Sequence, residues 1–334
     1  MKMKFPETIF EKTIGRERPW EITLLIGLAL LMMALIIGSV EYGISDFFIQ
    51  GYWRGFFIYP SIIFYILLIA PKLTQMENKV IEAIIPLGDL TEEKIHQIFE
   101  ETQAFRPLRE YMVVGAGVLI IIVSLLTGGD INFNLAGLYY LLQTATAFGM
   151  LSWTVYASVI SVRVTAQLLK QPLRVNLFDL DAFKVVGKSS LYLALAFIGG
   201  FTLALIFSAP DFAVFQSLDF WIINFPMFVI PVIIFFSNMY PTHKIIDSAK
   251  RAALKQVAQQ VRTVSDQMLT GAGQSSDAGM LSQAMQGLIA LEERIDKVQT
   301  WPYEVSTLRS LFGSILIPAV TVVAQVLLRR MLGW

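Results

Sequence analysis

The chain offers few side chains with the chemistry of a catalytic or metal-binding site. Its only histidines are His96 and His243, and it has no cysteine, so thiolate nucleophiles, disulfides and thiolate-bound metals are excluded. Neither histidine lies within an apolar segment, so a membrane haem held by two histidines does not fit. Since no nucleophile with a base and an orienting group emerges either, we predict a protein without enzymatic activity and without a cofactor.

Acidic residues occur twice at spacings that suit a metal ion. One group falls on one face of a predicted helix and comprises Glu92, Glu93, His96 and Glu100. A solvated helix face explains the same residues, and this is the interpretation we adopt. The other group is Asp179 and Asp181, a pattern that in some enzymes binds a divalent cation with a sugar nucleotide. Asp179 also suits the N-cap of a helix that begins at Leu180, and capping is the simpler interpretation.

Uncharged polar residues near the C-terminus share one face of an apolar helix. Ser314, Thr321 and Gln325 fall at positions i, i+7 and i+11, with Pro318 on the same side. Such groups are unfavourable in hydrocarbon unless they are hydrogen-bonded or face water. They therefore either bond to a neighbouring helix, which is the simpler interpretation, or line a pore that forms when several chains assemble.

The segments that carry these residues are those of a membrane protein. Hydrophobic residues make up 55% of the chain and charged residues 16%, and the mean hydropathy is +0.61. The formal net charge is zero, so nothing indicates a nucleic-acid partner. Seven segments approach or exceed the roughly 20 apolar residues that a spanning helix needs, namely 21–40, 54–70, 110–127, 137–160, 190–208, 219–239 and 311–328.

The interiors of these segments are neutral. None has an Asp, Glu, Lys, Arg or His near its centre, which argues against proton-driven transport. The fourth segment carries a weak stripe of hydroxyls formed by Thr154, Ser158 and Ser161, to which we assign a packing role. The fold class predicted from these segments is all-α.

The positive charges indicate how the chain is oriented. Of the 26 Lys and Arg residues, 23 fall in alternate gaps between the apolar segments, and the exceptions are Arg54, Arg329 and Arg330. Short loops rich in Lys and Arg stay on the cytoplasmic face of a membrane. With seven crossings, the N-terminus is then cytoplasmic and the C-terminus lies outside. We predict a multi-pass protein of the inner or plasma membrane.

Two spans are predicted to continue into the cytoplasm as helices. The fourth should extend to about Lys170. The helix that Asp179 caps should run without a break into the fifth span, with Phe178 and Phe183 forming a hydrophobic staple around its start.

A short helix is predicted between the second and third spans. Asp89 or Thr91 can cap residues 92–103. Its apolar residues would face the helix bundle or the lipid headgroups, and they are Ile95, Ile98 and Phe99.

An amphipathic hairpin is predicted after the sixth span. Pro241 permits a kink, apolar residues then recur at three- and four-residue steps over 246–268, and a glycine-containing linker at 270–279 turns the chain into a second amphipathic helix at 281–298. Such apolar stripes must be buried against other helices. The predicted parts are a six-helix membrane region with cytoplasmic extensions (1–240), a cytoplasmic hairpin (241–306) and a seventh transmembrane helix (307–334).

In layout the chain resembles the seven-transmembrane ion channel superfamily that includes insect odorant and gustatory receptors. The shared features are seven spans, a cytoplasmic N-terminus, cytoplasmic prolongations of the later spans and a last helix in two parts. The resemblance implies an anchor at 280–299 and a pore helix at 311–328, separated by Trp301, Pro302 and Tyr303. Gustatory receptors carry Thr-Tyr, five apolar residues and Gln-Phe in the last span, and of these only Gln325 is matched here.

The resemblance and the polar face together predict a homo-oligomeric membrane channel, with a tetramer favoured, that passes small ions. The predicted site residues are a pore lining of Ser314, Thr321 and Gln325, a gate at Val322, and an outer mouth at Arg329 and Arg330. The alternative is a non-conducting scaffold or signalling protein in the lipid bilayer whose hairpin binds a cytoplasmic protein partner. A facilitative carrier is disfavoured because no internal repeat is evident.

Overall fold

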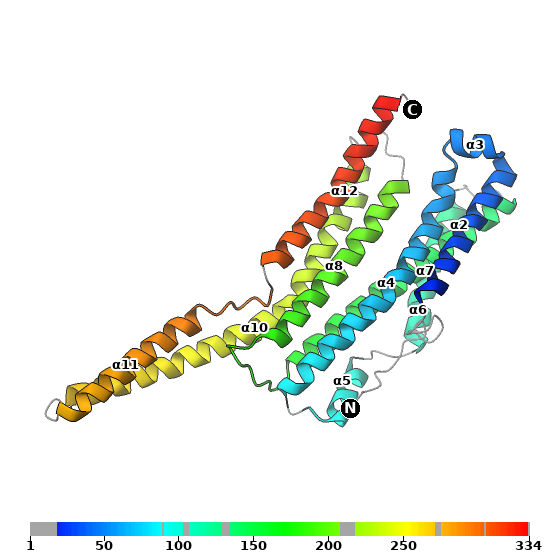
Figure 1. The fold of residues 1–334 in the computed structure, drawn as a ribbon. Helices are drawn as coiled ribbons and strands as arrows, with labels where there is room; N and C mark the ends of the chain where they lie inside the picture. The colour runs from blue at the N-terminus through cyan, green and yellow to red at the C-terminus, as the bar shows by residue number, and fades with distance from the viewer. Residues whose placement is uncertain are drawn as a thin grey trace.

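The computed structural model of the chain is a bundle of long helices with a helical hairpin that projects from one end (Figure 1). The residues it describes are 19–88, 90–102, 107–128, 134–207, 218–270, 275–303 and 305–332. Within these ranges every regular element is a helix, apart from an isolated β-bridge between Gly88 and Leu173. The predicted all-α fold is confirmed.

Most of the helices are long, with more than 20 residues. In chain order they are α2 (Trp20–Tyr42), α3 (Ile44–Ile49), α4 (Trp53–Ile84), η1 (Ile85–Leu87), α5 (Glu92–Glu101), α6 (Pro107–Gly128), α7 (Leu135–Leu169), α8 (Asp181–Phe207), α10 (Leu218–Thr270), α11 (Ser275–Asp296) and α12 (Val305–Leu332). In the described part of the chain, six helices are long and apolar enough to cross a membrane, namely α2, α4, α7, α8, α10 and α12. The third predicted span, 110–127, falls within the 22-residue helix α6, which is not one of these six. The architecture is that of a multi-pass membrane protein.

Two helices extend well past their apolar cores. α7 has 35 residues and ends at Leu169, which confirms the predicted extension to about Lys170. α4 has 32 residues and continues through Pro60 and Pro71, so it is longer than the predicted second span. At 1.5 Å per residue both helices measure about 50 Å, which exceeds the roughly 30 Å of a bilayer's hydrocarbon core. Both must project from the membrane.

Side-chain caps begin three of these helices. Thr91 accepts a hydrogen bond from the Lys94 amide (3.4 Å), as predicted for the start of α5, and Asp89 lies outside the described residues. Asn134 caps α7 by accepting from the Gly137 amide (2.8 Å). Each cap provides a partner for one of the amides that a helix start leaves unbonded.

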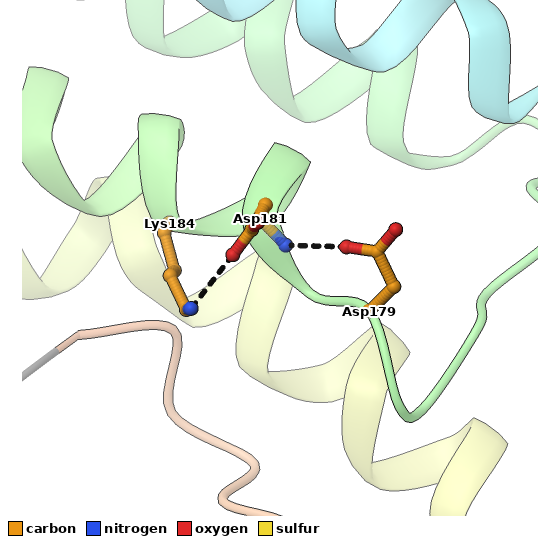
Figure 2. A network of polar contacts seen from close by, with 3 residues as sticks. All are labelled: Asp179, Asp181 and Lys184. Carbon is orange, nitrogen blue, oxygen red and sulfur yellow. Dashed lines mark hydrogen bonds and ion pairs between the residues drawn. The ribbon is translucent and has the colours of Figure 1, made fainter.

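α8 begins at Asp181, one residue later than predicted, and the side chain that bonds to its start is that of the predicted cap, Asp179. Its Oδ1 accepts from the Asp181 amide (3.3 Å), and the Asp181 carboxylate in turn pairs with Lys184 Nζ (2.7 Å; Figure 2). The two residues of the predicted hydrophobic staple have different surroundings. Phe183 is buried, whereas Phe178 is 51% exposed and lies beneath the Arg294 guanidinium. The Asp-x-Asp pattern is thus used for capping and for a local ion pair.

The largest apolar core lies at the end of the bundle from which the hairpin projects, here called the hairpin end. Five helices meet there, and the buried residues are Val80, Ile81 and Ile84 of α4, Ile95, Ile98 and Phe99 of α5, Ile160, Val164, Leu168 and Leu169 of α7, Phe183 and Val186 of α8, and Ile246 of α10. The predicted apolar face of α5 therefore packs into the bundle. The helical extensions bury one another's apolar stripes, as expected.

α8 occupies the middle of the bundle, where it packs against α4, α10 and α12. Small residues let its neighbours approach closely. A Cβ at Gly187 would lie 2.4 Å from the Pro302 carbonyl oxygen, and one at Gly199 would lie 2.2 Å from the Tyr65 hydroxyl. That hydroxyl donates to the Ala196 carbonyl (2.9 Å), which joins α4 to α8 directly.

The hairpin consists of the second half of α10 and the whole of α11 (Figure 1). α10 is a single 53-residue helix of about 80 Å that passes through Pro241 without a break, so the predicted boundary at 240 falls inside it. α11 begins at Ser275, earlier than the predicted linker end at Gly279. On α10, Ile246 and Val257 of the predicted stripe are buried, and Ala249, Ala253, Val261, Val264 and Met268 are half-buried. On α11, Ile295 is buried and Leu281, Met285 and Leu288 are half-buried, while the half-buried Val298 follows the end of the helix.

We predict that Gly187→Ala lowers the thermal unfolding midpoint of the purified protein, equivalent to a loss of about 1–3 kcal/mol, because the added methyl meets backbone that cannot move aside easily. Gly287→Ala on the exposed face of α11 is the matched control, since a Cβ there meets nothing within 4 Å and alanine favours the helix. Equal midpoints for the two variants would contradict the close packing of α8.

Candidate functional site

The helix that carries the predicted pore residues lies at the edge of the bundle. α12 is unbroken through Pro318 and packs against α8, with Leu311 fully buried. Only 11% of its apolar stretch is buried, whereas the other five candidate spans bury 22–39%. Its exposed large hydrophobic side chains are Phe312, Leu316, Ile317, Val320, Val323, Leu327, Leu328 and Met331. In length and composition α12 is a full span, but one side of it is uncovered.

The predicted pore-lining residues have different surroundings. Gln325 donates from Nε2 to the carbonyl oxygens of Leu205 (3.0 Å) and Ile206 (2.8 Å) at the end of α8. Those carbonyls belong to the last turn of α8, where a helix leaves acceptors without internal partners. The Thr321 hydroxyl donates to the Ile317 carbonyl of its own helix (2.8 Å). Gln325 thus takes part in helix-to-helix hydrogen bonding within the chain.

Thr321 and Gln325 also line an open groove on the outside of the chain, where α12 meets the end of α8. The other lining residues are Ile206, Gly313, Leu316, Ile317, Val320, Ala324 and Leu328. Ser314 and Val322 are half-buried and lie off this groove. Arg329 and Arg330 belong to the last turns of α12, and their side chains lie outside the described part of the structure. The structure therefore brings together two of the three predicted lining residues.

A second polar site, the polar cavity, lies between α4, α7, α8 and α10. It has a volume of about 60 Å³ for water-sized molecules, enough for several waters. Its polar lining comprises Thr74 and Glu77 of α4, Trp153, Thr154, Ser158 and Ser161 of α7, Ser189 of α8 and Asn238 of α10. From the sequence, the hydroxyl stripe of α7 is evident and is assigned to packing. Nothing in the sequence indicates that Glu77 and Asn238 lie beside that stripe.

The link between the hairpin and α12 is held against α10. The Trp301 ring stacks on His243 with 4.1 Å between ring centroids and 5° between planes, and His243 Nδ1 lies 3.3 Å from the Thr300 carbonyl oxygen. Lys250 Nζ donates to the Asp296 carbonyl and to the Val298 carbonyl (3.2 Å), where a positive charge suits the C-terminal end of α11. The predicted separator around Trp301 is non-helical and well anchored.

The acidic group on α5 is solvent-facing. Glu92, Glu93, His96 and Glu100 are all exposed, whereas the apolar residues between them are buried. Among the described residues, no three His, Asp or Glu side chains come together in a way that would hold a metal ion.

Comparison of the chain with protein-family models, curated proteins and solved structures finds no match. The features that bear on function are therefore the groove beside α12, the polar cavity and the hairpin.

We predict that Gln325→Leu destabilises the protein by about 1–2 kcal/mol, because two carbonyls at the end of α8 lose their donor. Thr321→Val should change stability little, since the lost hydroxyl bonds only to its own helix. Thermal unfolding in one detergent compares the two variants. A Gln325→Leu midpoint as high as that of Thr321→Val would show that the bonds to α8 contribute nothing.

Proposed function

We propose that this protein is a homo-oligomeric membrane channel, with four copies favoured, whose pore for small ions is lined by α12. The observation that carries this proposal is the combination of an uncovered spanning helix and polar side chains at an open groove. The resemblance in layout to the seven-transmembrane channels favours the tetramer.

The groove supports assembly because of what it would meet in a lipid bilayer. Thr321 and Gln325 line it, and Gln325 Oε1 is buried without a hydrogen-bond partner. A polar oxygen beside hydrocarbon is unfavourable unless water or another chain reaches it. Copies arranged around an axis next to α12 would bring a water-filled path to the groove that these two side chains line. Every copy would then contribute Thr321 and Gln325 to one lining, with Ser314 further along the same helix.

The remaining predicted roles follow from this arrangement. Val322, next to Thr321, is a candidate for an apolar constriction that closes the path by dewetting. Arg329 and Arg330 lie in the last turns of α12 and would surround the outer mouth, where positive charge disfavours cations. If they turn to the lipid headgroups instead, this selectivity disappears.

A second candidate function is a non-conducting scaffold that binds a protein partner through its hairpin. The observation in its favour is the large apolar side chains that remain exposed near the hairpin tip, where Leu269 is 77%, Met280 66% and Ile289 53% exposed. In the channel proposal the same residues contact the hairpins of neighbouring copies. The two functions therefore differ in what covers the tip and in whether ions pass.

The proposed orientation places the N-terminus and the hairpin in the cytoplasm and the end of α12 outside. It is supported by the concentration of basic residues in the gaps that lead to the hairpin end. It is also supported by α12, which begins beside the hairpin and ends at the opposite end of the bundle, the end at which α3 also lies (Figure 1).

Because the chain has no cysteine, a single introduced cysteine tests this orientation without labelling at other positions of the chain. We predict that a membrane-impermeant maleimide labels Ser45→Cys on α3 and Met331→Cys on α12 in intact cells. Ser282→Cys on α11 should react only after permeabilisation. All three positions are exposed. Labelling of Ser282→Cys and protection of Met331→Cys in intact cells would contradict the seventh crossing and the orientation.

We predict that the purified protein forms oligomers in nanodiscs and conducts ions in planar bilayers. Thr321→Val should change the single-channel conductance or ion selectivity, because it removes a lining hydroxyl without disturbing another helix. Thr263→Val is the matched control, since the Thr263 hydroxyl also bonds its own helix (3.1 Å) but lies on the exposed hairpin. No conductance under any condition, or equal currents from both variants, would count against the channel. A monomer or dimer that co-purifies with a stoichiometric partner would favour the scaffold.

A further inference from the structure

The polar cavity is lined by oxygen-bearing side chains from all four helices that surround it. On α7, the Thr154 hydroxyl donates to the Met150 carbonyl (2.8 Å) and the Ser158 hydroxyl donates to the Thr154 carbonyl (2.7 Å). Each hydroxyl has a single hydrogen and has used it within its own helix. What these side chains offer to the cavity is therefore the lone pairs of their oxygens.

Asn238 on α10 adds a further acceptor. Its Nδ2 donates to Ser190 Oγ (2.8 Å), and that hydroxyl donates to the Val186 carbonyl (2.8 Å). Since the Ser190 hydrogen is already used, the amide group that faces it must be the donor, and this fixes which way the Asn238 side chain points. Asn238 is only 7% exposed, and its Oδ1 is buried without a hydrogen-bond partner. A buried, unpartnered carbonyl oxygen beside a cavity calls for a donor or a cation.

The lining includes one carboxylate. It is contributed by Glu77 on α4, and among the described lining residues there is no Lys, Arg or His. A hydroxyl, an amide oxygen and a carboxylate are the ligands that hard cations prefer. Divalent ions are usually held by more than one carboxylate, whereas here a single carboxylate accompanies neutral oxygens. This balance suits an ion of charge +1.

We propose that the polar cavity binds one monovalent metal cation, Na⁺ or K⁺, through Asn238 Oδ1, the hydroxyl oxygens of Thr154 and Ser158, and the Glu77 carboxylate. The volume of about 60 Å³ accommodates such an ion with one or two waters. The ion joins α4, α7 and α10 beside α8, and its binding stabilises the folded bundle by mass action. The site is separate from the groove beside α12 and does not depend on the proposed pore.

The test uses the full-length protein, purified in detergent in N-methyl-D-glucamine chloride. NaCl or KCl replaces that salt at constant ionic strength while the thermal unfolding midpoint is followed by tryptophan fluorescence. We expect the midpoint to rise by several degrees and to saturate with one of the two ions. Flow dialysis with ²²Na⁺ or ⁸⁶Rb⁺ should give one bound ion per chain.

Two ligand variants, each with a control variant on the same helix, test which residues bind the cation. Thr154→Val and Glu77→Gln should each raise the cation concentration for half-maximal stabilisation about tenfold or more. Thr146→Val is the control on α7, because the Thr146 hydroxyl also bonds its own helix (2.8 Å) but Thr146 is exposed and is not among the residues that line the cavity. Glu82→Gln is the control on α4, where Glu82 is exposed. Both controls should keep the wild-type cation dependence.

Several results would overturn the proposal. They are an unfolding midpoint that is the same in all three salts, a rise produced only by Ca²⁺ or Mg²⁺, or a cation dependence that is unchanged in both Thr154→Val and Glu77→Gln. A misfolded variant is recognised by its size-exclusion profile and by its midpoint without metal cation. In that case the remaining ligand variant and the ²²Na⁺ stoichiometry of the wild-type protein decide the question.

Discussion

The close packing of α8 against its neighbours is the constraint on which the other features of this structure depend. Small residues bring its backbone near other chain segments, at Gly187 beside Pro302 and at Gly199 beside Tyr65. A membrane helix gains little from apolar burial alone, since lipid is equally apolar, so close packing and hydrogen bonds must hold it. α8 also forms part of the wall of both the polar cavity and the groove beside α12. A shift of this one helix would alter both sites together.

Much of the fold could be predicted because its signals are local. The cap at Asp179 and the hairpin stripes that include Ile246 and Ile295 depend on residues within a few positions of each other. The length of α4 could not be predicted in this way. Beyond Ala70 its hydropathy falls, and the helix persists there because Val80 and Ile81 are buried against helices that are distant in sequence. Tertiary packing therefore decides where a helix such as α4 ends.

The candidate sites were less accessible to prediction from the sequence, for the same physical reason. The polarity of Gln325 was evident, but its acceptors are carbonyls of Leu205 and Ile206, and every residue has a carbonyl. The polar cavity requires four helices to converge. Glu77 alone resembles an ordinary charged residue of a helix surface, and Asn238 resembles an ordinary polar residue at the end of a span. Only their placement beside the hydroxyls of α7 gives them a shared chemistry.

The continuity of α10 has a mechanical consequence. A single helix reaches from the membrane region to the tip of the hairpin, and about 44 Å of it lies beyond Pro241. Such a rod acts as a lever, in which a tilt of about 5° at the membrane displaces the tip by roughly 4 Å. The segment between α11 and α12 is held against α10 by Trp301 and Lys250, immediately before α12 begins. A displacement of the tip is therefore coupled, through these contacts, to the segment that leads into α12.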